Sequence, residues 1–88
     1  MKKTFDDIFI KRYPTLDLHG YDRNTTVVAL NEFINDNHKL HNHDLVIIHG
    51  IGQGIVKEAV FKTLAQNELV LEYKLHQYNL GMTIVKIK

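Results

Sequence analysis

A chain of 88 residues is long enough for one small domain with one hydrophobic core and too short for a second domain. Its 44% hydrophobic and 24% charged residues are typical of a soluble globular protein, and a net charge of +1 neither indicates nor excludes a nucleic-acid partner. The lack of cysteine excludes disulfides, and no apolar run approaches the ~20 residues of a membrane span, so we expect a cytoplasmic protein without a membrane partner.

Residues 1–14 form an N-terminal extension ahead of the domain, which we place at residues 15–88. Three apolar residues of the extension recur at helical spacing, namely Phe5, Ile8 and Phe9. This spacing predicts a short helix that packs on the domain or, as the alternative, binds a partner. Pro14 ends that helix, because proline moves the preceding residue out of helical geometry.

Strand and helix signals alternate after the extension. Residues 15–19 alternate between apolar and polar side chains, which predicts a strand that ends at Gly20. Asp22 is a suitable N-cap for a helix that continues to residues 37–39. The inward stripe of this helix comprises Val27, Leu30, Phe33 and Ile34.

A polar tract between this helix and the next strand contains four potential metal ligands: His38, His41, His43 and Asp44. Metal ligands need positions that the surrounding structure fixes, whereas a tract between a helix and a strand is typical of a simple connection. We therefore expect a polar connection here and no native metal site.

Residues 45–48 form a continuously apolar run, which is typical of an interior strand in a mainly parallel sheet. A second helix begins near Gly54 and ends near Asn67, a suitable C-terminal cap. The inward stripe of this second helix comprises Val56, Ala59, Val60 and Leu64.

Two further strands, at residues 69–75 and 82–88, are joined by a short loop and predict an antiparallel hairpin. One face of the hairpin is expected to carry Leu71, Tyr73 and Leu75 from the first strand, and one face of the second strand Thr83, Val85 and Ile87. His76 lies in the connecting loop, where we expect a solvated side chain.

The order strand, helix, strand, helix, strand, strand predicts an α+β fold. Right-handed crossovers place both helices on one face of a mixed four-stranded sheet, which gives a two-layer βαβαββ sandwich. The first two strands should be parallel, so their C-terminal ends lie at one edge of the sheet, where open α/β sheets bind ligands.

Residues 49–54, His-Gly-Ile-Gly-Gln-Gly, join the second strand to the second helix. The glycines at 50, 52 and 54 permit positive φ angles and a close approach of a ligand, and the start of a helix favours an anion. Their spacing differs from that of dinucleotide-binding and Walker-type loops. The turn predicts a phosphate site, with tight packing of strand and helix as the alternative.

Polar side chains converge on this turn. Asp17 and His19 end the first strand, and His49 stands at the mouth of the turn. Lys57, one turn into the helix, can reach the same anion. We expect Asp17 to orient a histidine or activate water, and the histidines to transfer protons at a phosphodiester. The alternatives are that Asp17 only caps a turn or the first helix and that His19 only forms a hydrogen bond to the neighbouring main chain.

Two motifs resemble those of the small MutS-related (Smr) domain: Leu-Asp-Leu-His-Gly at 16–20 and Ile-His-Gly-Ile-Gly-Gln-Gly at 48–54. The segment Gly-Met-Thr-Ile-Val at 81–85 is similar to the last-strand motif of that family. The resemblance extends over residues 15–88. It implies the two-layer fold of the C-terminal domain of translation initiation factor three.

The resemblance also implies an RNA or DNA partner and an endonuclease that nicks DNA or cuts RNA, including messenger RNA at stalled ribosomes. It assigns catalysis to Asp17, His19 and His49. It assigns phosphate or nucleic-acid contacts to Gly20, Gly50, Gly52, Gln53, Gly54 and Lys57. Lysine stands here where the family often has arginine, which keeps the charge without the bidentate geometry. No cofactor is expected, and the sequence does not indicate a divalent metal.

A non-catalytic module that binds RNA or DNA is the main alternative, and a protein-interaction or metal module is a third. A binding module would rely on phosphate contacts and be sensitive to salt, because few aromatic residues are available for stacking. The peripheral candidates for such contacts are Tyr21, Tyr78, Lys74, Lys86 and Lys88.

Overall fold

The computed structural model describes residues 13–51 and 54–88. The helix expected around Phe5, Ile8 and Phe9 and the contacts expected of Gly52 and Gln53 lie outside the described residues. The elements in chain order are β1 (Thr15–Asp17), α2 (Arg23–Lys39), β2 (Asp44–Ile48), α3 (Ile55–Gln66), β3 (Val70–Leu75) and β4 (Met82–Ile87). This order confirms the predicted βαβαββ sandwich.

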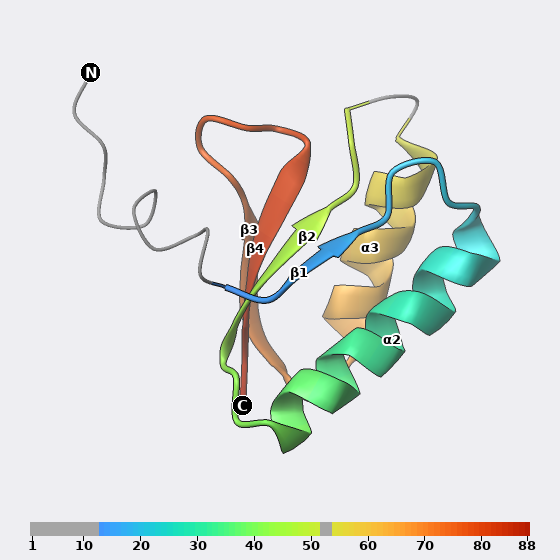
Figure 1. Ribbon diagram of the computed structural model, residues 1–88. Helices are drawn as coiled ribbons and strands as arrows, with labels where there is room; N and C mark the ends of the chain where they lie inside the picture. The colour runs from blue at the N-terminus through green and yellow to red at the C-terminus, as the bar shows by residue number, and fades with distance from the viewer. Residues whose placement is uncertain (1–12, 52–53) are drawn as a thin grey trace.

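The sheet has the strand order β1-β2-β4-β3. β1 pairs with β2 in parallel, whereas β4 pairs antiparallel with both β2 and β3. Figure 1 shows both helices on one side of this mixed sheet, as the sequence predicts. No helix in the described ranges is long and apolar enough to cross a bilayer.

The core lies between the sheet and the two helices. Its fully buried members come from both helices and from one face of the strands: Leu18, Leu30, Ile34, Leu45, Ile47, Val60, Leu64, Val85 and Ile87. These side chains recur at helical spacing in α2 and α3 and at alternate positions in β2 and β4. Burial of this apolar area is the main contribution to folding.

Both helices begin and end at residues that suit those positions. The Asp22 side chain accepts a hydrogen bond from the backbone N–H of Thr25 at 2.7 Å and so caps α2. α3 follows Gly54, whose φ of +85° is the left-handed geometry that glycine adopts readily. Asn67 ends α3, and its side chain donates to the Asn31 side chain of α2 at 2.9 Å. The two helices are thereby joined at that end.

Two expectations for the hairpin are wrong. The pairing of β3 with β4 shifts between Val70 and Glu72, so the regular alternation is broken at Leu71, which is 58% exposed. Val70, which pairs with the buried Ile87 and packs against the core, takes the inward position that the alternation assigns to Leu71. His76 is buried rather than solvated, and its Nδ1 atom accepts the backbone N–H groups of Tyr78 and Asn79.

Three connections meet at one edge of the sheet: residues 18–22 after β1, the described residues 49–51 and 54 after β2, and residues 76–81 between β3 and β4. We call this the loop edge. Figure 1 shows these connections together at the upper end of the molecule. The loop edge includes the C-terminal ends of both parallel strands, where the sequence predicts the functional site.

Candidate functional site

The loop edge brings together the two sequence motifs that lie some thirty residues apart. Asp17 pairs with Ile48 in the β1–β2 register, and the Leu18 N–H donates to the Ile48 carbonyl at 2.7 Å. Gly50 has a φ of +81°, and a Cβ atom added there would lie 3.6 Å from the Cβ of His19. The end of β1 therefore contacts the glycine turn directly.

Asp17 and His19 form a hydrogen-bonded pair at this edge. Asp17 Oδ1 accepts the backbone N–H of His19 at 3.1 Å and lies 2.5 Å from His19 Nδ1. The two side chains are 50% and 73% exposed, so a ligand can reach both. The hydrogen bonds from the His19 side chain and backbone lower the pKa of Asp17, which is therefore a carboxylate at neutral pH.

The ionised carboxylate sets the tautomer of its partner. A carboxylate only accepts hydrogen bonds, so the proton of neutral His19 resides on Nδ1 and faces Asp17. Nε2 then presents a lone pair, and among the described residues no group bonds to it. This arrangement makes His19 an oriented proton acceptor, and a proton donor when it is protonated.

His49 occupies a different environment, beneath the turn. It is 4% exposed, its Nδ1 lies 2.9 Å from the Gly50 carbonyl, and its Nε2 lies 2.8 Å from Thr83 Oγ1. Because a carbonyl only accepts, neutral His49 donates from Nδ1 and accepts the Thr83 hydroxyl proton at Nε2. Burial, together with the positive charge of Lys57, lowers the pKa of His49 and keeps its ring neutral.

β4 supports the glycine turn from below. The Gly81 carbonyl accepts the backbone N–H groups of His49 at 2.9 Å and Gly50 at 3.0 Å. Thr83, two residues later, is fully buried and holds the His49 ring. Sequence reasoning did not single out Thr83 as a site residue. A polar side chain on the inward face of a strand is the signal that indicates such a role.

A shallow concavity of about 400 Å³ lies between the end of β1 and the start of α3. It is lined by both polar and apolar residues, which include His19, Tyr21, Gly50, Gly54, Ile55 and Lys57. Gly54 provides no side-chain cap to α3, so the first N–H groups of that helix have no side-chain acceptor there. Arg23 and Lys57 outnumber Asp22, whose carboxylate caps α2, and together with the start of α3 they give the concavity a positive character.

A second hollow of about 380 Å³ lies on the face of the sheet opposite the helices. Its polar lining carries both signs of charge, with Asp44 and Glu72 on either side of Lys86 in the strand register and Lys74 close by. The opposing charges cancel, so this hollow suits an anion less well than the concavity at the loop edge.

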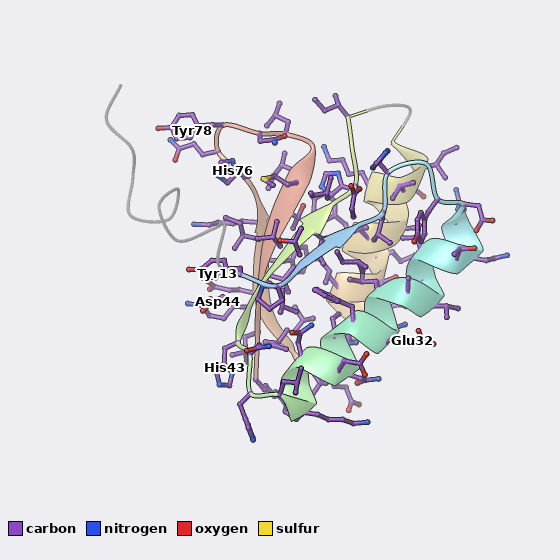
Figure 2. The ribbon with its side chains drawn as sticks, in the orientation of Figure 1. Tyr13, Glu32, His43, Asp44, His76 and Tyr78 are labelled. Carbon is purple, nitrogen blue, oxygen red and sulfur yellow. The ribbon has the colours of Figure 1, made fainter. Side chains whose placement is uncertain are left out.

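Within residues 13–51 and 54–88, no group of three or more metal-ligating side chains lies close enough together to hold a metal ion. Two histidines of the 38–44 tract have another role. The ring nitrogen Nδ1 of His38 lies 3.0 Å from the Lys88 carbonyl, and that of His43 lies 3.3 Å from the Ile87 carbonyl. These contacts join the α2–β2 connection to the end of β4; Figure 2 labels His43 at that end of the sheet.

The family model of the Smr domain matches residues 16–88. The chain belongs to the Smr domain family. Proteins named endonuclease MutS2 share 39% identity over 77 residues (Streptococcus suis) and 36% over 69 residues (Aquifex aeolicus). These matches cover 83% and 78% of the chain but only 10% and 9% of the two relatives, so the chain spans about a tenth of their length.

Two solved structures share the fold of this Smr domain. The Smr domain of Thermus thermophilus MutS2 has a TM-score of 0.82 at 19% identity, over 85% of this chain and 98% of that one. YdaL, a stand-alone small MutS-related protein from Escherichia coli, has a TM-score of 0.77 at 20% identity, over 100% of this chain and 78% of that one.

Among the site residues expected from the Smr motifs, the fold brings seven of the described ones to the loop edge. Asp17 and His19 are exposed, and His49 is buried below them. Gly20, Gly50, Gly54 and Lys57 line the concavity together with His19 and His49, whereas Asp17 reaches it only through its hydrogen bond to His19. The roles expected of Asp17, His19 and His49 in catalysis stay predictions.

Proposed function

We propose that this Smr domain is an endonuclease that binds RNA or DNA at the loop edge and cleaves a phosphodiester bond there. One observation carries the proposal: His19, whose ring is hydrogen-bonded to the exposed Asp17 carboxylate, lines the same concavity as the start of α3 and Lys57. An oriented histidine beside a cationic, N–H-rich turn suits proton transfer at a phosphate group.

In the proposed reaction, His19 Nε2 takes the proton of the attacking hydroxyl, which is water or, in RNA, the neighbouring 2′-hydroxyl. The new bond forms to phosphorus, and the bond from phosphorus to the leaving oxygen breaks. Protonated His19 or water returns a proton to that oxygen. Asp17 orients the imidazole and stabilises its charge, while Lys57 and the N–H groups near Gly54 compensate the charge on the phosphate oxygens.

We assign His49 a positioning role. Both of its ring nitrogens have partners, and its burial disfavours the charged form that proton transfer requires. Through Thr83 and the Gly50 carbonyl, His49 fixes the turn against β4. Gly52 and Gln53 lie outside the described residues, and we propose them as phosphate contacts on the Smr motif alone.

The names of the relatives support this proposal, since the MutS2 proteins that share the domain are called endonucleases. The domain is only about a tenth of their length, so the proposal is that this chain cleaves nucleic acid without the rest of a MutS2 protein. A cytoplasmic location and action at ribosomes are further parts of the proposal, and they follow from the lack of cysteine and from the family resemblance respectively.

Substitution of the pair tests the proposal. Asp17→Asn and His19→Gln should each lower the rate of cleavage of a labelled single-stranded RNA and of nicking of supercoiled DNA by about 10²–10⁴-fold, the usual contribution of general acid–base catalysis. Glu32→Gln, on the exposed face of α2 in Figure 2, is the matched control and should cleave like the parent.

Two results would count against the nuclease. If Asp17→Asn preparations cleave as fast as the parent, the activity belongs to another group or a contaminant. If the immobilised parent protein binds an oligonucleotide for hours and salt then elutes it uncut, the domain is the non-catalytic binding module instead. Circular dichroism of each variant checks that the fold is retained.

A further inference from the structure

The loop edge carries an unusual share of exposed apolar side chains. Large hydrophobic residues that are exposed number nine in the described part of the chain, and five of them lie in or beside its three connections: Tyr21, Ile51, Ile55, Tyr78 and Leu80. Exposures of these five range from 40% to 74%. Apolar side chains clustered around a polar site mark a surface that binds something partly apolar.

Contacts between and within the connections hold two of these side chains, Ile51 and Tyr78, in place. A Cβ atom added to Gly81 would lie 3.4 Å from Ile51 Cγ1, so the β3–β4 loop contacts the end of the β2 turn. The buried His76 accepts the N–H of Tyr78, and the two rings meet edge to face with centroids 6.2 Å apart. Figure 2 shows Tyr78 at the tip of that loop, held above His76.

The concavity beside the Asp17–His19 pair has a lining of two chemical kinds. Gly54 and Lys57 contribute polar groups to its lining, and Tyr21 and Ile55 contribute apolar side chains. Its volume of about 400 Å³ is at the lower end of the range for small-molecule sites, which suits a single nucleotide. A nucleotide offers both kinds of group, a phosphate for the polar lining and a base for the apolar lining.

The charges of the concavity favour an unpaired strand over a duplex. Proteins that bind duplexes through the backbone rely on several lysine and arginine contacts to phosphates. The cationic side chains that line this concavity are Arg23 and Lys57 alone among the described residues. Stacking of a base on an exposed aromatic ring adds affinity without further charge, and only an unpaired base offers its face.

We infer that the concavity accepts one unpaired nucleotide, with its base against Tyr21 and Ile55, and that the enzyme prefers single-stranded or locally unpaired RNA or DNA. The inference rests on the proposed nuclease function and adds the class of substrate. A fully paired duplex must flip or unstack a nucleotide to reach the same position, which costs energy and slows its cleavage.

Cleavage of four labelled substrates of one sequence tests the inference: a single strand, a perfect duplex, a duplex with a three-nucleotide bulge, and the single strand as DNA. The single strands and the bulge should be cut at least tenfold faster than the perfect duplex, with cuts in the bulge at the unpaired nucleotides. Equal rates on duplex and single strand would overturn the inference while leaving the nuclease intact. No cleavage of any substrate would instead overturn the proposed function.

Binding separates the role of Tyr21 from catalysis. In an Asp17→Asn background, Tyr21→Ala should weaken the affinity for an uncleaved single-stranded 12-mer, measured by fluorescence anisotropy, by about tenfold, because base stacking is lost. Tyr21→Phe keeps the ring and should bind like the background protein. Leu40→Ala, an exposed residue at the far end of α2, is the control. Unchanged affinity in Tyr21→Ala would contradict the proposed base contact.

Discussion

His19 and His49 each follow a strand of the same sheet, but the fold gives their imidazoles opposite environments. His19 is 73% exposed and is oriented by an exposed carboxylate. His49 is 4% exposed and lies between the Gly50 carbonyl and the Thr83 hydroxyl, with the Phe61 ring 5.9 Å away. One histidine can therefore exchange protons with a ligand, while the other joins the glycine turn to β4.

The lowered pKa of His49 predicts a pH dependence of stability. As the pH falls below ~6.5, the unfolded chain takes up a proton on His49 before the folded protein does, so the free energy of unfolding decreases. His49→Gln cannot take up that proton. Urea denaturation at pH 7.5 and pH 5.5 should therefore show a larger loss of stability in the parent than in the variant.

The other five histidines are present in both proteins, so their contributions to the pH dependence of stability cancel when the two proteins are compared. Parallel losses of stability in the parent and in His49→Gln would mean that His49 is protonated equally easily in the folded and unfolded states, and the buried neutral ring described above would be wrong.

At the scale of single elements, α2 depends on its first turn. The carboxylate of Asp22 accepts the Thr25 N–H, and this bond lowers the pKa of Asp22. Asp22→Ala leaves that N–H without its acceptor and removes a negative charge from the positive end of the helix. The melting temperature at pH 7 should fall by several degrees in differential scanning calorimetry.

Removing the exposed Glu32 side chain, in the middle of α2, provides the comparison for Asp22→Ala. Glu32→Ala should melt within about a degree of the parent, because exposed sites without capping contacts contribute little to stability. The difference between the two variants should also shrink below pH 3.8, where Asp22 becomes protonated in the unfolded chain and its capping contribution decreases. A constant difference down to pH 2 would exclude the ionised cap.

Periodicity in the sequence predicts most of the elements, because burial of one face is what selects them. The alternation of β4 and the helical stripes that contain Leu30, Ile34, Val60 and Leu64 all point into the core. The irregularity at Leu71 could not be predicted, because it depends on how β3 pairs with β4 and not on β3 itself. The buried position of His76 likewise depends on the conformation of its loop.

At the scale of the whole molecule, the parallel pairing of β1 and β2 is what places the two motifs at one edge. That pairing follows from the order of elements, so the location of the site was predictable from the sequence. The different roles of His19 and His49 could not be predicted from the sequence, because they depend on the burial of the His49 ring and on the exposed carboxylate beside the His19 ring.

The strand order of the sheet also explains why Gly81 and Thr83 hold the glycine turn. β4 lies between β2 and β3, so its first residues pass directly beneath the glycine turn. Gly81 then binds the turn through its carbonyl and Thr83 through its hydroxyl. β4 and the residue before it therefore join the glycine turn to the β3–β4 loop.

NMR chemical-shift mapping with a short, uncleavable single-stranded oligonucleotide tests most directly whether the two motifs bind one phosphate together. Resonances of Asp17, His19, Gly50, Gly54 and Lys57 should shift together as the oligonucleotide is added, with a single dissociation constant. Shifts confined to the opposite hollow, around Lys74 and Lys86, would contradict a phosphate site at the loop edge.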